Sequence, residues 1–361
     1  MPPPTLQAID RAFRDGVLEL SAPPTRFYLN LTERCSLRCR HCITRAPELT
    51  ASGAARDMSL EVVEALRPHL AHATYVGFPH AGEPLIAPAL EPVLRALQEE
   101  RARTGARPAD TVVHLLTNGL ALTEERFARL CGLGVCSWSV SMDGMSPQTN
   151  DRLRLGGHIE RLLEQLQAIT HLKRTSFPSV RLGVAWTVTR SNLHEVPQLL
   201  EWAAATGLDW VKLEEVFPLN PDAALEADLA PQRLLAALAE ARAAAAALGV
   251  RLLEHVFETP VFKCRLGSDP EMARFSLLDD FANRMEINGC RLPYELVCIE
   301  PDGDLKPLSF HHPVGGNLLR EGLSATWSSA RFFEARAQMR AERPCGGGPA
   351  TCSSDPGPDR W

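Results

Sequence analysis

The sequence of 361 residues has no apolar run of about 18 residues, the length a membrane-spanning helix needs. Its N-terminus, MPPPTLQAIDRAFRDG, lacks the apolar core of a signal peptide. Basic residues are not in excess, since 38 lysines and arginines face 44 aspartates and glutamates, for a formal net charge of −6. No repeat of the solenoid type is present. These absences argue against membrane and nucleic-acid partners and predict a cytoplasmic protein.

The composition is that of a folded protein with a sizeable core. Apolar residues make up 45% of the chain and charged residues 23%, which is ordinary for a globular protein. Because cytosolic thiols stay reduced, the ten cysteines indicate metal ligands or buried thiols rather than disulfides. Cys131 and Cys136 flank an apolar stretch, and we expect both to pack as small hydrophobic residues.

Between residues 26 and 249, short apolar runs alternate with amphipathic stretches of helical period, which is typical of βα units around a parallel sheet. The predicted strands are RFYLNLT, ATYVGFPH, TVVHLLTN, VCSWSVSMD, VRLGVAWTVT and DWVKLEEVFP. The predicted helices are SLEVVEALRPHLA, ALEPVLRALQEERAR, TEERFARLCGLG, HIERLLEQLQAITHLKR, HEVPQLLEWAAATG and PQRLLAALAEARAAAAALG. Six units are too few for a closed eight-stranded barrel, so we expect an α/β fold that is an open partial barrel or a doubly wound sheet. In both, functional residues gather at the carboxyl ends of the strands.

After residue 250 the pattern changes. LVCIEPDGDLKPLSF predicts a hairpin that turns at residues 301–304, and SATWSSARFFEARAQMRAE predicts a terminal helix. The expected organisation is an N-terminal extension at residues 1–25, a βα domain at 26–249 and a cysteine-containing region at 250–361.

The stretch CSLRCRHC follows the first predicted strand and contains Cys35, Cys39 and Cys42. A closed structural zinc site normally takes four ligands, so three clustered thiolates predict a metal centre with one open position. Soft sulfur ligands favour zinc or an iron–sulfur cluster, and three thiolates on a four-iron cluster leave one iron free for an outside ligand. The loop also holds four arginines, Arg34, Arg38, Arg40 and Arg45. They either offset the cluster charge and attract an acidic electron donor, or are solvated loop charges.

This loop resembles the hallmark CxxxCxφC of the radical S-adenosylmethionine (SAM) enzymes, with His41 before the last cysteine. AGEP at residues 81–84 resembles the family's GGEP, and TNG at residues 117–119 ends the third strand as in many members. SMDGMSPQTNDRLRLGG, which begins at Ser141, resembles SxDGxxxxxHDxxRG. The sequence departs from the family at Ala81, Asn150 and Leu155, where glycine, histidine and glycine are usual. The resemblance covers about residues 24–218.

The resemblance implies a partial (β/α)6 TIM-like barrel and a [4Fe–4S] cluster on Cys35, Cys39 and Cys42, with SAM on the open iron. The implied reaction is reductive cleavage of SAM to methionine and a 5′-deoxyadenosyl radical, which removes a hydrogen atom from substrate. A reduced flavodoxin- or ferredoxin-type protein is the implied electron donor. The implied cofactor-binding residues are His41, Gly82, Glu83, Asn118, Ser141 and Arg154.

By the same resemblance Glu83 binds the SAM amino group, Ser141 the ribose and Arg154 the carboxylate. Singly, each residue has an ordinary alternative, such as Ser141 as a strand-end cap and Arg154 as a surface charge.

The C-terminal segment CRLPYELVCIEPDGDLKPLSFHHPVGGNLLREGLSATW resembles the start of the SPASM or twitch extension, which carries auxiliary clusters in many of these enzymes. Leu308 stands where that extension has a cysteine. We expect one auxiliary [4Fe–4S] cluster, and the alternative is a degenerate extension that has lost its iron. The expected ligands are Cys290, Cys298, Cys345 and Cys352, with Cys264 as a spare thiol.

The leading hypothesis for the substrate is a small-molecule secondary metabolite of sugar, aminocyclitol or nucleoside type. It rests on residues 1–25, which are too few for the leader-peptide-binding domain that many peptide maturases carry. One alternative is a maturase of a ribosomally made peptide. Another is a catalytically inactive metal-binding protein, against which Glu83 and Arg154 argue. Titratable groups near predicted strand or hairpin ends are His80, Glu214, Glu215, His311 and His312.

Overall fold

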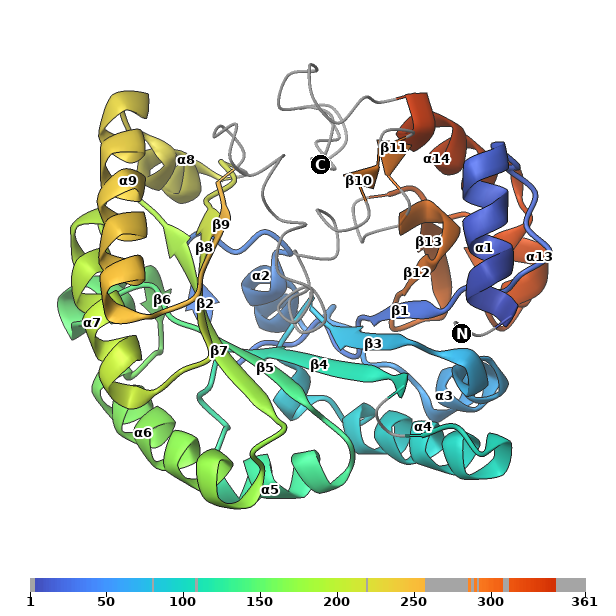
Figure 1. Ribbon diagram of the computed structural model, residues 1–361, viewed down its shortest axis with the longest axis horizontal. Helices are drawn as coiled ribbons and strands as arrows, with labels where there is room; N and C mark the ends of the chain where they lie inside the picture. The colour runs from blue at the N-terminus through green and yellow to red at the C-terminus, as the bar shows by residue number, and fades with distance from the viewer. Residues whose placement is uncertain are drawn as a thin grey trace.

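The computed structural model describes residues 4–79, 81–107, 110–218, 220–256, 285–286, 289–290, 292–307 and 312–341. Within these ranges, the main sheet has ten strands in the order β14-β13-β12-β1-β3-β4-β5-β7-β8-β9. The strands from β12 to β9 run parallel to their neighbours. The sheet is curved, with the major helices on its outer side (Figure 1). This is the mixed α/β fold with a mostly parallel sheet that the sequence predicts.

All six predicted strands are present, as β1 (Arg26–Leu29), β3 (Tyr75–Phe78), β4 (Val112–Thr117), β5 (Ser137–Ser141), β7 (Arg181–Val188) and β8 (Trp210–Glu215). The predicted helices form as α3 (Leu60–Leu66) continued by η1 (Arg67–His72), α4 (Leu90–Thr104), α5 (Glu124–Gly132), α6 (Ile159–Ser176), α7 (Val196–Thr206) and α9 (Pro231–Leu248). Two begin with side-chain caps, because the hydroxyls of Ser59 and Thr123 accept hydrogen bonds from the amides of Val62 and Arg126.

The remaining helices are α1 (Pro4–Asp15), α2 (Ala46–Ser52), η2 (Pro84–Ile86), the π-helical turn η4 (Pro147–Asp151), η5 (Leu193–Glu195), α8 (Pro221–Ala227), η6 (Leu292–Tyr294), α13 (Leu323–Trp327) and α14 (Ala330–Ala341). Short strand pairs are β2 (Arg38–Cys39) with β6 (Arg154–Leu155), and β10 (Met285–Glu286) with β11 (Gly289–Cys290). In the described parts of the chain, every helix is too short or too polar to serve as a membrane span.

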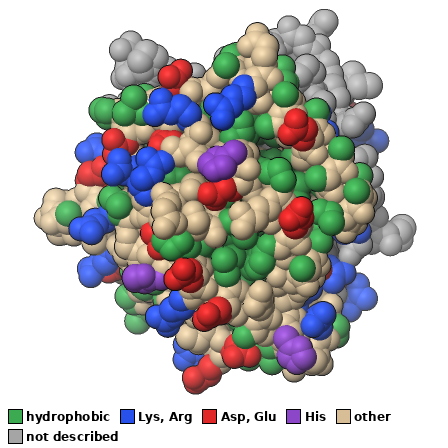
Figure 2. Space-filling view, turned by 90° about the vertical axis from the view of Figure 1, so that its left-hand side faces the viewer, with side chains coloured by type: hydrophobic (Ala, Val, Ile, Leu, Met, Phe, Trp, Pro, Cys, Tyr) green, Lys and Arg blue, Asp and Glu red, His purple; other side chains and the backbone are tan. Residues whose placement is uncertain are grey.

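The parallel strands are buried on both faces, which explains why they read as nearly continuous apolar runs. Successive residues of a strand point to opposite faces. In β3, Val76 and Phe78 belong to the main core beneath the helices, whereas Tyr75 packs with Tyr28 inside the curve of the sheet. The helical face formed by α6, α7 and α9 carries charges of both signs interspersed (Figure 2), so this face is not uniformly basic.

The sheet continues beyond the boundary expected at residue 249. β9 (Leu252–His255) extends it beside β8, and β12 (Leu296–Ile299) pairs parallel with β1 at the other end. β12 and β13 (Asp304–Pro307) form the predicted antiparallel hairpin, and β14 (Gly316–Asn317) pairs with β13. The single terminal helix predicted from the sequence is two helices, α13 and α14, separated by residues 328–329.

The N-terminal helix α1 lies beside the C-terminal elements α13 and α14 (Figure 1). The ring of Phe13 contacts that of Tyr294 edge-on, with ring centroids 5.2 Å apart. Arg336 of α14 is fully buried, and its guanidinium stacks over Trp327 at 4.4 Å. It donates hydrogen bonds to the carbonyls of Leu18, Pro293 and Trp327. One side chain therefore joins the N-terminal segment to the C-terminal region.

Arg336→Met is expected to lower the free energy of unfolding by about 3 kcal/mol, because it leaves buried carbonyls without donors. The matched control is Arg331→Met on the same helix, since Arg331 is exposed and its ion pair among the described residues is with the exposed Glu334. We expect that variant to change stability by less than about 0.5 kcal/mol. Denaturant titration measures both, and equal midpoints for the two variants would contradict the role of Arg336.

Candidate active site

The three predicted metal ligands, Cys35, Cys39 and Cys42, lie on the loop after β1. β2 within this loop pairs antiparallel with β6, which places Cys39 opposite Arg154. Residues 154–155 follow the end of β5 through the π-helical turn η4. The pairing therefore holds the cysteine loop against the segment that follows SMDG, although the paired residues Cys39 and Arg154 are 115 positions apart in sequence.

Burial raises the pKa of the Cys39 thiol to about 12, and the positive charge of Arg154 opposes this. The pKa of Cys35 is also raised, by burial and by the nearby charges of Glu83 and Cys42. Each thiol is thus within electrostatic range of others in the loop. A cluster binds thiolates, so metal binding here must release protons, and Arg154 is the cation that favours the deprotonated form.

No group of three or more His, Cys, Asp or Glu side chains within the described ranges is arranged to hold a single metal ion. A zinc ion needs its ligand atoms around one point, at about 2.0–2.3 Å from the metal. In a four-iron cluster, by contrast, each cysteine binds a different iron. Three thiols from one loop, with the guanidinium of Arg154 beside them, are a donor set that a [4Fe–4S] cluster with one open iron can use.

Glu83 is 2% exposed and its carboxylate is bound mainly by the chain itself. Oε1 accepts hydrogen bonds from the Leu85 amide at 3.0 Å and the Thr117 hydroxyl at 2.6 Å. Oε2 accepts one from the Asn118 amide at 2.7 Å. Burial raises the pKa of Glu83, and these hydrogen bonds oppose the shift. Glu83 thus fixes the end of β4.

Gly82 is required by close packing, because a Cβ there would lie 1.9 Å from the carbonyl oxygen of Arg34. Its amide donates to the carbonyl of Thr32 at 2.7 Å, and the Glu83 amide donates to Arg34. The AGEP segment is therefore bonded along the start of the cysteine loop. Ala81, which stands where the family has glycine, has a φ of 74°, in the left-handed region.

Ala81→Gly is expected to stabilise the protein by about 0.5–1 kcal/mol. The left-handed conformation costs alanine about 1–2 kcal/mol, and the greater freedom of glycine in the unfolded chain offsets part of that gain. Ala87→Gly is the matched control, because Ala87 has a φ of −71° and gains nothing from glycine. The midpoint temperature of thermal unfolding should rise for Ala81→Gly and fall for Ala87→Gly. A fall for both would contradict strain at Ala81.

Asp143, the acid of the SMDG motif, is fully buried between the guanidinium of Arg154 and the imidazole of His41. Its Oδ2 accepts from Arg154 Nη1 at 2.7 Å and lies 3.1 Å from His41 Nε2, while Oδ1 accepts from the Thr187 amide at 2.7 Å. Burial alone raises the pKa of Asp143, but Arg154 and His41 outweigh it and the pKa is lowered. Asn150, at the usual histidine position, accepts from the Asp143 amide.

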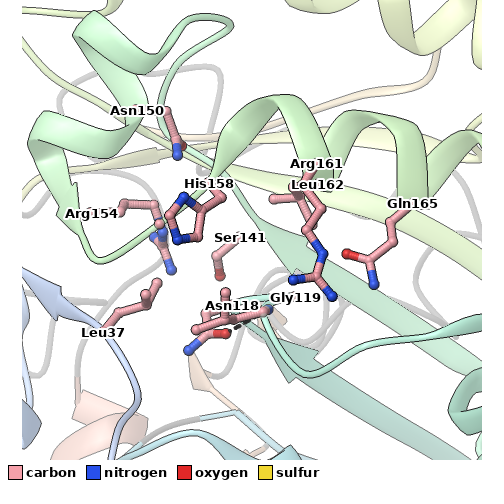
Figure 3. A pocket seen from close by; sticks show the side chains of 12 residues that line it. Leu37, Asn118, Gly119, Ser141, Asn150, Arg154, His158, Arg161, Leu162 and Gln165 are labelled. Atoms are coloured by element: carbon pink, nitrogen blue, oxygen red, sulfur yellow. Dashed lines mark hydrogen bonds between the residues drawn. The ribbon is translucent and has the colours of Figure 1, made fainter.

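A pocket opens beside this network (Figure 3). Its lining residues come from the cysteine loop, the end of β4, the end of β5 and the start of α6: Leu37, Asn118, Gly119, Leu120, Ser141, Asn150, Arg154, Gly157, His158, Arg161, Leu162 and Gln165. Asn118 Nδ2 donates to Ser36 Oγ at 3.1 Å and lies 3.7 Å from Cys35 Sγ. The predicted residues Asn118, Ser141 and Arg154 are therefore brought together next to the thiols.

His41 lies outside this pocket lining. It is 7% exposed, and its Nδ1 is buried without a hydrogen-bond partner among the described residues. A buried, unpaired ring nitrogen beside Cys42 is suited to a polar group that is not part of the chain. Gly82 and Glu83 also contribute no lining atoms and instead support the loop and the end of β4.

The expected auxiliary-cluster ligands fall in different places. Cys298 is fully buried in β12 among Tyr28, Tyr75 and Leu296, and burial raises its pKa well above the usual value. Cys290 ends β11, which fixes only its backbone position. Leu308 and three of the cysteines, Cys264, Cys345 and Cys352, lie outside the described residues.

The titratable residues predicted near strand or hairpin ends lie in different surroundings. Glu214 of β8 pairs with the buried Lys212 at 3.0 Å, and Glu215 follows it. Burial and then the charge of Lys306 lower the pKa of His312 to about 4. The other two, His80 and His311, lie outside the described residues.

Sequence reasoning missed three contributors to this site. Asp143 was visible as the acid of SMDG, but its motif position suggests a turn rather than a contact with both Arg154 and His41. His158 and Arg161 line the pocket from the start of α6, and no motif marks them. Only the fold brings that helix to the end of β5.

Comparison with known proteins agrees with the family resemblance of the cysteine loop. Residues 29–203 match the family model of the Radical SAM superfamily. The GTP 3′,8-cyclase of Rhodopseudomonas palustris is 31% identical over 194 residues, 53% of this chain and 52% of the cyclase. The chain spans about half the length of such curated relatives. The mycofactocin maturase MftC of Mycobacterium tuberculosis is 21% identical over 320 residues, 88% of this chain and 73% of the maturase.

Among solved structures, Streptococcus suis SuiB bound to precursor peptide SuiA superposes with a TM-score of 0.63 and 13% sequence identity. The superposition covers 91% of this chain and 69% of SuiB. At that identity it shows a shared fold. The family match spans the cysteine loop, the AGEP and TNG segments and the SMDG motif, so the chain carries a domain of the radical SAM superfamily.

Proposed function

We propose that the protein is a radical SAM enzyme that cleaves SAM reductively and removes a hydrogen atom from its substrate. The observation that carries this is the β2–β6 pairing. It joins the three-cysteine loop to Arg154 beside a pocket lined by Asn118 and Ser141. When bound, the cluster and SAM supply the electron and the 5′-deoxyadenosyl radical for this chemistry.

The chain's own residues hold and orient these groups. Cys35, Cys39 and Cys42 bind the cluster, and Arg154 stabilises the thiolates of Cys35 and Cys39 by charge. Asp143 holds Arg154 in position from the end of β5. Glu83 fixes the end of β4 and so orients Asn118, whose amide group faces Cys35. The supporting hydrogen bonds are buried, which preorganises the site.

The test uses the wild-type chain, reconstituted anaerobically with iron and sulfide. We expect about four irons per cluster, an EPR signal after reduction that changes when SAM is added, and release of 5′-deoxyadenosine. Bound zinc alone, with no SAM-induced change in the spectrum, would overturn the proposal and leave the inactive metal-binding alternative.

For the substrate we propose a small molecule rich in hydroxyl or amino groups, of the sugar, aminocyclitol or nucleoside type. The inner face of the sheet supports this, because it is polar on β5 and β8. Ser139 and Lys212 are 2% exposed and face inward, opposite to the core residues Val140 and Leu213. Three neighbouring strands bring Ser141 of β5, Ala185 of β7 and Lys212 of β8 into register. The small side chain of Ala185 therefore lies between two polar side chains.

A second candidate is maturation of a ribosomally made peptide. The alignment with the mycofactocin maturase favours it, because that alignment extends over 320 residues and includes the C-terminal region. Incubation with SAM, reductant and either candidate small molecules or leader-bearing peptides separates the two. Release of 5′-deoxyadenosine stimulated only by a leader-bearing peptide would overturn the small-molecule proposal.

We further propose that Cys298 is a structural thiol rather than an auxiliary-cluster ligand. Its burial among Tyr28, Tyr75 and Leu296 supports this assignment. An auxiliary cluster, if bound after reconstitution, should therefore keep its iron content in a Cys298→Ala variant.

A further inference from the structure

A second polar cluster lies on the inner side of the curved sheet, at the end where β12 joins β1. Asn30 directly follows β1, and Glu300 directly follows β12, so both lie at the carboxyl ends of neighbouring parallel strands. Asn30 Nδ2 lies 3.7 Å from the Sγ of Cys298, a residue that packs inside the curve. Lys306 of β13 pairs with Cys298 in the strand register. We call Asn30, Glu300 and Lys306 the inner polar cluster.

The hydrogen bonds of this cluster fix the orientation of the Asn30 amide. Oε2 of Glu300 accepts from Asn30 Nδ2 at 3.1 Å, and Oε1 lies 2.9 Å from Lys306 Nζ. A carboxylate oxygen accepts hydrogen bonds and does not donate them, so the nitrogen of the amide must face Glu300. The oxygen, Oδ1, then faces another way. Asn30 is fully buried, and its Oδ1 has no hydrogen-bond donor among the residues that the structure describes.

The other five asparagines in the described ranges differ from Asn30 in this respect. In each of them Oδ1 accepts a hydrogen bond from a backbone amide, and they are Asn118, Asn150, Asn192, Asn220 and Asn317. Buried polar atoms are normally paired, and an unpaired one calls for a partner from outside the chain. Oδ1 of Asn30 is thus an acceptor suited to a ligand that supplies an N–H or O–H group.

The charges of the cluster favour a neutral donor. Glu300 is 6% exposed, and its negative charge is offset by Lys306, so the pair adds no net charge beside Asn30. An ammonium group would gain little there, whereas a hydroxyl group donates a hydrogen bond without bringing a charge. Burial of Asn30 also means that a hydroxyl bound to Oδ1 is enclosed. Enclosure suits radical chemistry, because it keeps water away from the reacting groups.

We propose that the inner polar cluster binds a hydroxyl group of the substrate, with Oδ1 of Asn30 as its acceptor. This rests on the proposed function, because it names residues that select the substrate of that reaction. The pocket beside the cysteine loop is lined from β4, β5 and α6, whereas the cluster belongs to β1, β12 and β13. β12 and β13 lie at the opposite end of the sheet from β8 and β9 (Figure 1). The C-terminal hairpin thus contributes to the choice of substrate.

The first test needs no variant. The anaerobically reconstituted wild type is given SAM and reductant with an amino sugar (glucosamine), an aminocyclitol (2-deoxystreptamine) or a nucleoside (adenosine). We expect one of these compounds to stimulate release of 5′-deoxyadenosine. Analogues of that compound, each lacking one hydroxyl, are then compared with it. One analogue should need a concentration about 10- to 100-fold higher for half-maximal stimulation, as for the loss of a buried hydrogen bond.

The second test asks whether Asn30 binds the hydroxyl that this analogue lacks. Asn30→Leu removes the acceptor at similar side-chain size, so it should raise the half-maximal concentration of the parent compound by the same factor. It should cause no further loss with the analogue, because the two deletions remove the same hydrogen bond. The matched control is Asn220→Leu, because Oδ1 of Asn220 accepts from the Ala223 amide at 2.8 Å and caps α8. That variant should unfold at a lower temperature and keep the wild-type half-maximal concentration.

The assignment of Asn30 is overturned if every deoxy analogue is as potent as its parent, or if Asn30→Leu still distinguishes parent from analogue as the wild type does. It is also overturned if the wild type cleaves SAM but responds to none of the three compounds, or only to a leader-bearing peptide. A wild type that binds no iron–sulfur cluster or cleaves no SAM would instead overturn the proposed function.

Discussion

Simultaneous Cys35→Ala, Cys39→Ala and Cys42→Ala substitution is expected to reduce release of 5′-deoxyadenosine to the background of iron-free protein. The three thiols are the proposed ligands of the catalytic cluster, and removing them leaves Arg154 beside a loop that cannot hold iron. We also expect the SAM-induced change in the EPR spectrum to disappear. Reconstitution under argon, followed by spectroscopy and chromatography of the products, measures both.

The matched control is Cys131→Ala, because Cys131 is a partly buried thiol on α5 that packs against the core. It should retain full iron content and activity. A triple variant that still cleaves SAM would contradict the assignment of the loop. Iron–sulfur absorbance that persists in the triple variant without SAM cleavage would report a second, auxiliary cluster.

Asp143→Asn is expected to cost about 3–5 kcal/mol of folding stability, the range for breaking a buried ion pair from one side. The substitution keeps the shape of the side chain but leaves the charge of Arg154 buried without its partner, and removes the acceptor near His41. The same variant should lose the order of the cysteine loop, because Arg154 connects that loop to β5. Denaturant unfolding of iron-free wild-type and variant chains measures the stability difference.

The pH dependence of this difference follows from the lowered pKa of Asp143. An acid whose pKa is lower in the folded state stabilises the fold fully above its unfolded pKa of about 3.9. That contribution decreases as the pH falls below this value toward the folded pKa. The difference in free energy of unfolding between wild type and Asp143→Asn should thus be constant from about pH 8 to pH 5 and become smaller in stronger acid.

Asp222→Asn is the control for this prediction. Asp222 is about half exposed and lies 3.8 Å from Arg40, so its loss should change stability by less than about 1 kcal/mol. Equal losses for the two variants, or a gap for Asp143→Asn that widens in acid, would contradict the role of the buried network.

The strands and major helices follow from local sequence, because parallel strands buried on both faces are short apolar runs and the outer helices are amphipathic. The motif residues likewise lie at predicted strand ends, where a parallel sheet gathers them. The π-helical turn η4 and the β2–β6 pair could not be foreseen, since each strand is two residues long and its partner is remote in sequence. The position of Arg161 in the pocket lining likewise depends on the fold and not on a sequence motif.

The same distinction explains the C-terminal region. The hairpin could be predicted from its Pro-Asp-Gly-Asp turn, but no local sequence pattern predicts that β12 pairs with β1. The break between α13 and α14 was also hidden, because Ser328 and Ser329 occur within a pattern that reads as one helix. Contacts such as those of Arg336, with carbonyls on three different segments, exist only after the chain has folded.

The pairing of β12 with β1 has a consequence for how the chain can be divided. β1 is the first strand of the radical SAM domain, yet its backbone is hydrogen-bonded along one edge to β12 and the residue before it. The amides of Thr25 and Arg26 donate to the carbonyl of Glu295, and the amide of Asn30 donates to the carbonyl of Ile299. A fragment cut after residue 256 would present these groups as an open edge that can recruit a strand from another molecule. The late segment thus protects the earliest strand from aggregation, and a soluble minimal domain has to include it.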